Sequence, residues 1–197
     1  MDIVLATTNG HKIREIRALL KGFTQFDLYS LVDFPGYVQP EETGVTFEEN
    51  AILKALDCAQ RLQKWTIADD SGLVVPALGG VPGVYSARYA GVGATDKDNR
   101  KKLLQAMRGL QGLDRAAYFE CWIALSSPEK IYKTVSATCE GVIIAEEKGS
   151  HGFGYDPLFL KHDYNQTFAE LSEERKNLVS HRGKALEKLK RILEQVT

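Results

Sequence analysis

The first half of the chain alternates between apolar runs and helical repeats. A compact apolar run over residues 3–6 is typical of a buried strand, and residues 13–20 repeat apolar side chains at helical spacing. A second short strand is expected over residues 27–31. Thr46 and Glu49 have the spacing of a capping box, which predicts that a long helix begins directly after Thr46.

Two adjacent carboxylates follow the next apolar run, over residues 65–68. We expect this run to be a strand that ends at Asp69 and Asp70, with a turn at Gly72 directly after it. Adjacent carboxylates repel each other, and a divalent cation is the simplest partner that stabilises both. The pattern therefore indicates a metal site, with a solvated Asp-Asp-Ser-Gly turn as the alternative.

The second half of the chain is richer in β pattern. Residues 118–125 and 131–138 flank a polar segment and are expected to form an antiparallel hairpin, with a further short strand over 142–144. Because strands and helices alternate first and the hairpin comes later, the sequence favours an α/β fold with a mixed sheet. No repeat or long linker divides residues 1–197, so we expect a single domain. Further helices are expected from Thr95 or Asp96 onward, over 171–178 and over 185–196.

Composition and charge narrow the function classes. The 25 basic and 26 acidic residues give a formal net charge of -1, so no global basic field attracts nucleic acid or an anionic membrane. The three cysteines lack the spacing of a zinc site or a redox pair, and we expect buried free thiols. The start of the chain lacks a signal-like pattern and no long apolar segment follows, so we expect a cytoplasmic protein.

Polar residues between the first strand and the first helix are a candidate anion site. Backbone N–H groups at the helix start, hydroxyl groups and Lys12 would form a phosphate cradle, and an ordinary capped helix start is the alternative. On the long helix, Asn50 and Lys54 are four residues apart and could project from one face. Exposed polar side chains are the alternative, and the pair alone favours them.

Two later segments are candidates for binding a nucleotide. Glycines on both sides of Phe153 let backbone approach a flat ring, and Phe153 or Tyr155 could stack on a nucleobase. A tight turn with core aromatics is the alternative. His181 and Arg182 concentrate donors at the start of the terminal helix, which suits an anionic or carbonyl-bearing ligand, although a conventional serine cap at Ser180 also fits.

Taken together, these motifs resemble the inosine/xanthosine triphosphate pyrophosphatase family, the house-cleaning hydrolases of non-canonical purine nucleotides. The match covers nearly the whole chain in the right order. It rests on Thr-Thr-Asn-x-x-Lys at 7–12, Glu-x-Gly-x-Thr-Phe-x-Glu-Asn-Ala at 42–51, Ala-Asp-Asp-Ser-Gly at 68–72, Gly-Phe-Gly-Tyr-Asp-Pro at 152–157 and Ser-His-Arg at 180–182.

The resemblance implies that a homodimer hydrolyses ITP, dITP and XTP to the nucleoside monophosphate and pyrophosphate, with Mg²⁺ as cofactor. It also implies a long mixed central β-sheet with two α/β lobes and an active-site cleft between them. Carried over residue by residue, the family pattern makes Asp70 the general base, with Lys12 and Asp69 as further catalytic residues, and makes Glu42, Asp69 and Asp70 the metal ligands. The implied substrate contacts are Thr7, Thr8, Asn9, Gly10, His11, Lys12, Lys54, Ser71, Phe153, Gly154, Tyr155, Asp156, Lys176, His181 and Arg182.

Overall fold

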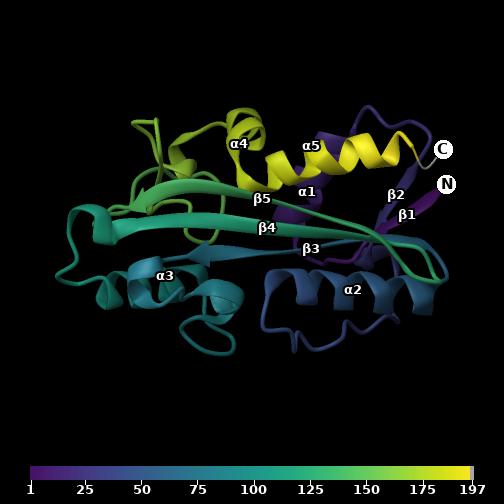
Figure 1. Ribbon diagram of the computed structural model, residues 1–197, viewed down its shortest axis with the longest axis horizontal. Coiled ribbons are helices and arrows are strands. Elements are labelled where there is room, and N and C mark those ends of the chain that lie inside the picture. Colours follow the sequence, from purple (N-terminus) through teal and green to yellow (C-terminus); the bar gives the residue numbers. More distant parts are fainter. Residues whose placement is uncertain (196–197) are drawn as a thin grey trace. The chain divides into compact units, whose positions relative to one another are not determined.

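The protein, seen here as a computed structural model that describes residues 1–195, is built on a six-stranded sheet of order β2-β1-β3-β4-β5-β6 (Figure 1). Val196, part of the expected terminal helix, lies outside the described range. The strands are β1 (Asp2–Leu5), β2 (Asp27–Ser30), β3 (Trp65–Val74), β4 (Ala116–Ser126), β5 (Ile131–Ile143) and β6 (Phe159–Lys161). The helices are α1 (Gly10–Leu20), α2 (Phe47–Leu62), α3 (Asp96–Ala106), α4 (Glu173–Val179) and α5 (His181–Leu193).

The sheet contains both strand orientations. β1 pairs in parallel with β2 and with β3, whereas β5 and β6 are antiparallel. The parallel pairs require crossover helices, and α1 and α2 follow β1 and β2 along the chain. The expected α/β fold with a mixed sheet is therefore confirmed.

The chain divides into two compact units. Unit 1 comprises residues 1–70 and 121–137 and the chain from Arg182 onward, and unit 2 comprises residues 71–120 and 138–181. The division falls inside β3, between Asp70 and Ser71, and at the start of α5, between His181 and Arg182.

Unit 1 buries its strands on both faces. Ile3 and Leu5 of β1 share a core with Ile16 of α1 and Leu189 of α5. Val4, which points the opposite way along the same strand, belongs to a second core with small side chains of α2. The strand therefore reads as a continuous apolar run, and its helices lie on two sides of the sheet (Figure 1).

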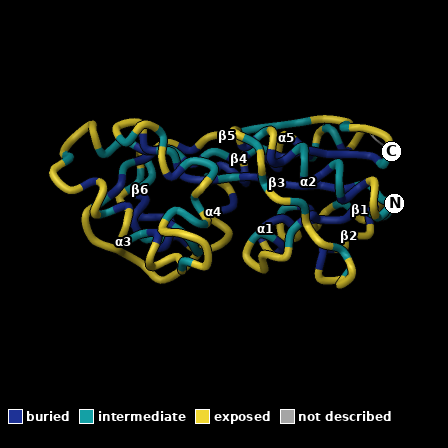
Figure 2. Tube along the Cα trace, turned by 90° about the horizontal axis from the view of Figure 1, so that it is seen from below, coloured by how far each residue is buried: buried dark blue, intermediate teal, exposed yellow. Residues whose placement is uncertain are grey.

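Unit 2 is built around aromatic rings. Phe119 of β4 lies 4.7 Å from Phe159 of β6 and 5.8 Å from Phe168, measured between ring centroids. The His181 ring stacks on Phe119 at 4.7 Å with an interplanar angle of 9°. Figure 2 shows β1, β3 and β4 as mostly buried, whereas β2 and β5 consist mainly of intermediate and exposed residues. All three cysteines are free and buried, as expected.

The structure corrects two strand predictions. β3 does not end at Asp70 but continues to Val74, so Gly72 lies within a strand and not in a turn. Buried Leu73 resumes the apolar pattern after the glycine, in a strand that pairs with β1 over residues 65–67 and neighbours β4 in the sheet. The expected separate strand over 142–144 is instead the last part of β5.

Candidate active site

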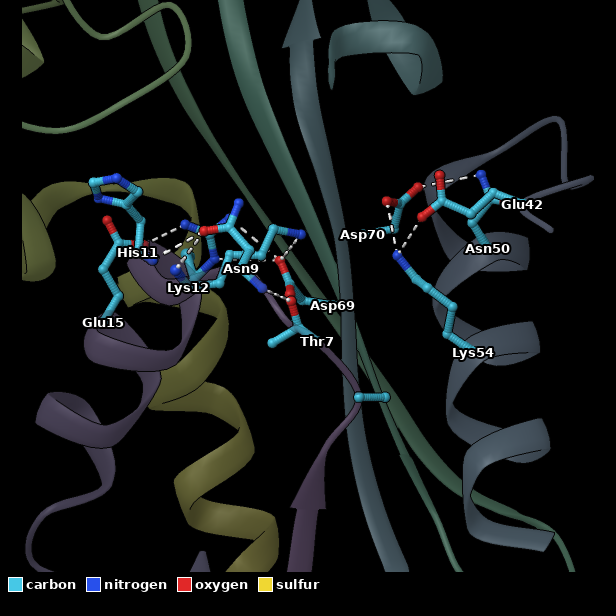
Figure 3. A network of polar contacts seen from close by, with 12 residues as sticks. Thr7, Asn9, His11, Lys12, Glu15, Glu42, Asn50, Lys54, Asp69 and Asp70 are labelled. Atoms are coloured by element: carbon cyan, nitrogen blue, oxygen red, sulfur yellow. Dashed lines mark hydrogen bonds and ion pairs between the residues drawn. The ribbon is translucent and has the colours of Figure 1, made fainter. Parts of the chain in front are cut away.

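Asp69 and Asp70 lie on opposite faces of β3 (Figure 3). Successive side chains of a strand point to opposite sides of the sheet, and both residues are inside the strand. Asp69 faces Lys12 of α1, whereas Asp70 faces α2. In direct contact, Asp69 pairs with Lys12 and Arg182, and Asp70 pairs with Lys54. The role of the two carboxylates as joint metal ligands stays a prediction.

Asp70 is held by two residues of α2. Lys54 Nζ lies 3.1 Å from Asp70 Oδ1 and 2.9 Å from Glu42 Oε1, so one ammonium bridges two carboxylates. Asn50 Nδ2 donates to Asp70 Oδ2 at 3.2 Å. The spacing of four residues places Asn50 and Lys54 on the same face of α2.

The start of α2 is fixed by local hydrogen bonds. The Thr46 hydroxyl accepts from Glu49 N at 3.1 Å, which caps the helix. Asn50 Oδ1 accepts from Gly44 N at 2.8 Å and ties the preceding loop to the helix. A Cβ atom at Gly44 would lie 2.7 Å from that oxygen, so the close approach requires glycine. These bonds set the loop that carries Glu42.

Burial and neighbouring charges shift the pKa values of Asp70 and Lys54 in opposite directions. Burial raises the pKa of Asp70 above its usual value, although the neighbouring Lys54 and Lys12 oppose the shift. For Lys54, burial lowers the pKa, but the Asp70, Asp69 and Glu42 carboxylates outweigh it, and the pKa is raised. Lys54 therefore stays charged, while Asp70 is more easily protonated than an exposed aspartate.

Asp69 belongs to a buried ionic network of unit 1. Lys12 Nζ lies 2.9 Å from Asp69 Oδ2, and Arg182 Nη2 lies 3.2 Å from the same atom. Arg182 also pairs through Nη1 with Glu15 of α1. Burial favours protonation of Asp69, but the Lys12 and Arg182 charges outweigh it and hold its pKa well below the usual range. The Arg182 pKa is raised by Glu15 and Asp69 against the effect of burial.

The loop before α1 is a capped helix start. Asn9 Oδ1 accepts from the backbone N–H groups of His11 at 2.9 Å and Lys12 at 3.3 Å. Asn9 N donates in turn to the Thr7 hydroxyl at 3.1 Å. Thr8, Gly10 and His11 are exposed, with the His11 ring 2.9 Å from the Arg14 guanidinium. The cap and a phosphate cradle are compatible, because exposed groups of this loop flank Lys12.

Unit 2 holds the glycine-flanked segment of residues 152–156, which we call the aromatic loop. Asp156 Oδ2 accepts from Phe153 N at 2.9 Å and from Lys176 Nζ at 2.7 Å. The Lys176 ammonium lies 4.8 Å from the centroid of the Phe153 ring. Gly152 has a φ of 74°, and a Cβ atom there would lie 2.0 Å from Asp156 Oδ2, so only glycine fits.

The two aromatic candidates of this loop differ in exposure. Tyr155 is buried and its hydroxyl donates to Ser86 O at 2.9 Å, which makes it a core residue. Phe153 is half-buried and retains accessible ring surface. Of the two rings, Phe153 is therefore the one with surface available for stacking on a base.

The remaining predicted contacts divide between the units. His181 is buried against Phe119, and Ser71 is half-buried in β3; both belong to unit 2. Arg182 belongs to unit 1, where Glu15 and Asp69 engage its guanidinium. The structure thus brings Glu42, Lys54 and Asp70 together, and separately Lys12, Asp69 and Arg182.

The carboxylates of Glu42 and Asp70 fit a cation. They already share the Lys54 ammonium, which occupies the position of a bound positive charge. Among residues 1–195 no group of three or more His, Cys, Asp or Glu side chains is arranged to hold a metal ion. Two carboxylates are nevertheless a usual protein contribution to Mg²⁺, which takes its other ligands from water and substrate phosphates.

Sequence reasoning missed Glu15 as a site residue. It lies on the buried side of α1, next to Ile16, and pairs with Arg182 across a separation of 167 residues. The sequence signal is a single acidic residue within an apolar helix face, which identifies no partner. Asn50 was expected to share a face with Lys54, but its contact with Asp70 depends on the packing of α2 against β3.

No helix within the described part of the chain has the length and apolar character needed to cross a bilayer. The sequence and the fold both match known proteins. The dITP/XTP pyrophosphatase of Chlamydia trachomatis serovar L2 is 59% identical over 198 residues, covering 100% of this chain and 94% of the relative. The structure of the Staphylococcus aureus Ham1 protein superposes with a TM-score of 0.89 at 41% identity, with 100% of both chains covered.

A Ham1 protein from Coxiella burnetii gives a TM-score of 0.90 at 40% identity over 99% of each chain. The profile of the Ham1 family matches residues 3–192. Identity at this level over the full length, with the same fold, confirms the resemblance drawn from the sequence motifs. The chain belongs to the Ham1 family.

Proposed function

We propose that this protein hydrolyses non-canonical purine nucleoside triphosphates (dITP, XTP and ITP) to the nucleoside monophosphate and pyrophosphate. The relative from Chlamydia trachomatis carries the name dITP/XTP pyrophosphatase and matches the whole chain. The observation that carries the proposal in this chain is the cluster of partly exposed Glu42 with buried Lys54 and Asp70. It supplies a base, a cation and a second carboxylate at one place.

Asp70 is the general base in this proposal. Its carboxylate is buried and its pKa is raised, which makes it a better proton acceptor than an exposed aspartate. Asp70 takes a proton from water, and the water oxygen forms a bond to the α-phosphorus. The bond between that phosphorus and the α–β bridging oxygen breaks, and its electron pair leaves with pyrophosphate.

We propose that Glu42 and Asp70 hold Mg²⁺ together with phosphate oxygens of the substrate. When bound, the ion supplies charge neutralisation and lowers the pKa of a nearby water. Lys54 bridges these two carboxylates, and its ammonium would be a further positive charge beside the substrate phosphates. Asn50 keeps the orientation of Asp70 through Oδ2.

Lys12 and the loop before it contact the triphosphate in this proposal. Lys12 is partly exposed, with 16% of its side chain accessible, while its partner Asp69 is buried. Asp69 therefore holds the Lys12 ammonium at the surface of the network, where it can meet an anion. A positioned cation of this kind is worth a few kcal/mol to a transition state that develops negative charge, about 3 kcal/mol for one donor.

Unit 2 binds the base. Phe153 offers a ring face, and Lys176 and His181 offer donors for the 6-carbonyl of hypoxanthine or xanthine. Adenine presents an amino group at the same position and would face these donors with a donor. A buried polar site left unpaired in this way discriminates by up to about 10⁴.

A panel of nucleoside triphosphates tests the proposal. Purified protein with Mg²⁺ should convert dITP, XTP and ITP to monophosphates with release of pyrophosphate, and should turn over ATP far more slowly. Chromatography of the products identifies the cleaved bond. Release of orthophosphate would contradict the proposal, and so would equal turnover of ATP.

We also propose a homodimer, on the strength of the family resemblance. Light scattering coupled to size exclusion measures the mass in solution. A mass of twice the 21.9 kDa of one chain is expected, and a monomer at micromolar concentration would contradict it.

A further inference from the structure

Two side chains of α3 form hydrogen bonds with the backbone N–H and C=O groups of Gly154 in the aromatic loop. Gly154 N donates to Asp96 Oδ2 at 2.7 Å, and Gly154 O accepts from Arg100 Nη1 at 2.8 Å. Asp96 and Arg100 are four residues apart, so both side chains leave α3 on the same face. Two successive peptide groups of the loop are therefore fixed by one helix.

Further contacts fix the Arg100 and Asp96 side chains that bind Gly154. Arg100 forms a bidentate pair with Glu147, with Nε 2.9 Å from Oε1 and Nη2 3.1 Å from Oε2. Only 14% of the Arg100 side chain is accessible, so the guanidinium is held in one geometry. At the helix start, Thr95 and Asp98 form a complete capping box, which fixes the first turn that carries Asp96.

The loop needs such support because of its glycines. Gly154 has a φ of 61°, and a Cβ atom there would meet nothing within 4 Å, so glycine is used for its backbone conformation and not for lack of space. A segment with two glycines loses much conformational entropy when it is ordered. From within, Asp156 holds the loop through Phe153 N; from outside, α3 holds it through Gly154.

We propose that Asp96 and Arg100 are positioning residues that preorganise the aromatic loop for the purine base. This inference rests on the proposed function, because it assigns Phe153 to base stacking. Neither side chain touches the substrate in this account. They lower the cost of base binding by fixing the loop before the nucleotide arrives, which sets affinity for the base without changing the chemistry at the phosphates.

Two kinds of variant separate this role from general stability. Asp96→Ala removes the acceptor and Arg100→Met removes the donor, whereas Asp96→Asn keeps an acceptor oxygen. Lys101→Met is the matched control, since it removes a positive charge from an exposed position next to Arg100 on the same helix. Thermal unfolding of each variant checks that it is folded.

The first measurement is steady-state kinetics with dITP and inhibition by inorganic tripolyphosphate, which has no base. Asp96→Ala and Arg100→Met should each raise KM for dITP about tenfold, change kcat less than threefold and leave tripolyphosphate inhibition unchanged. Asp96→Asn should restore most of the affinity, and Lys101→Met should behave as wild type. Equal weakening of dITP and tripolyphosphate, or no change in KM, would overturn the proposal.

The second measurement needs no substrate. Hydrogen exchange of the ligand-free protein should become faster over residues 149–158 in Asp96→Ala and Arg100→Met, and stay unchanged in Lys101→Met. Unchanged exchange in the first two variants would overturn the positioning role even if the wild type hydrolyses dITP. Failure of the wild type to release pyrophosphate from dITP would instead contradict the proposed function, while the exchange result would still decide whether α3 holds the loop.

Discussion

The two units carry polar chemistry of different kinds. In unit 1 the candidate site is a set of buried charges, in which Lys54 bridges Glu42 and Asp70 and Arg182 pairs with Glu15 and Asp69. In unit 2 it is a loop whose backbone conformation presents a ring, with Asp156 and Lys176 as its buried ion pair. Charges suit a triphosphate and its reaction, and rings suit a base. In the proposed function, rate and base selection are therefore assigned to separate parts of the chain.

The largest expected effect is on turnover when the proposed base is removed. Asp70→Asn should lower kcat for dITP by about 10³, because general base catalysis contributes 10²–10⁴. Nucleotide affinity should fall much less than kcat, since Asn preserves the shape of the side chain and Glu42 remains as the second carboxylate proposed to hold Mg²⁺. Rapid-quench kinetics and equilibrium binding measure the two effects. A loss of affinity as large as the loss of rate would make Asp70 a binding residue. It would contradict the proposal that unit 1 sets the rate and unit 2 selects the base.

The next effect is on stability and concerns the ionic network of unit 1. Arg182→Met leaves the Glu15 and Asp69 carboxylates buried beside each other without their shared guanidinium. Breaking a buried ion pair in this way should lower the free energy of unfolding by about 3–5 kcal/mol. Urea denaturation measures it, with Arg100→Met of unit 2 as a less buried comparison. A change below about 1 kcal/mol would show that the network contributes little.

A smaller effect should appear in unit 2. Phe153→Ala removes the ring proposed to stack on the base, which is worth about 1–3 kcal/mol. We expect KM for dITP to rise about tenfold or more, with kcat and tripolyphosphate inhibition little changed. Phe153→Leu should fall between the two, because it keeps apolar surface without the ring. If Phe153→Ala lowers kcat as strongly as Asp70→Asn, catalysis and base binding are not separated between the two units.

The smallest effect compares the neighbouring aspartates by pH. The folded-state pKa of Asp69 is depressed, so its stabilising contribution is present above the unfolded value and is lost as pH falls through the folded pKa. Asp70 has the opposite sign: its pKa is raised, so its ionised form costs stability once the pH rises above the folded pKa.

Variants of the two residues should therefore respond to pH in opposite directions. Asp70→Asn removes the buried partner of Lys54, which lowers Tm at every pH, but between pH 3 and pH 7 its Tm should rise relative to that of the wild type by about 2 °C. Asp69→Asn should lower Tm at pH 7, and its deficit should shrink only in strong acid. Thermal unfolding between pH 3 and 8 measures both. A Tm of Asp70→Asn that falls relative to the wild type as pH rises from 3 to 7 would contradict the assigned direction.

Much of the fold followed from the sequence because each element carries its own signal. The Thr46 cap and the apolar face behind it located α2, and the apolar run at residues 3–6 located β1. The error at β3 has a physical cause: Gly72 looks like a turn in sequence, but the strand continues through it to buried Leu73, with β4 as its neighbour in the sheet. Once the strand continues, side-chain alternation separates Asp69 from Asp70.

The sequence motifs predicted candidate site residues, but they did not predict which of these residues contact one another. Motifs identified Glu42, Lys54 and Asp70 individually, but the shared ammonium depends on the packing of α2 beside β3. The contact between Arg182 and Glu15 joins residues 167 apart, and no local pattern encodes it. Likewise, the hydrogen bond from Arg100 to Gly154 O joins residues 54 apart in sequence and is visible only in the folded chain.

The most direct test follows the oxygen of the attacking water. Hydrolysis of dITP in water enriched in ¹⁸O, under single-turnover conditions, places the label on whichever phosphorus was attacked. Mass spectrometry should find the label in dIMP and not in pyrophosphate, because Asp70 is proposed to direct water to the α-phosphorus. Label in pyrophosphate, or labelled orthophosphate, would contradict the mechanism.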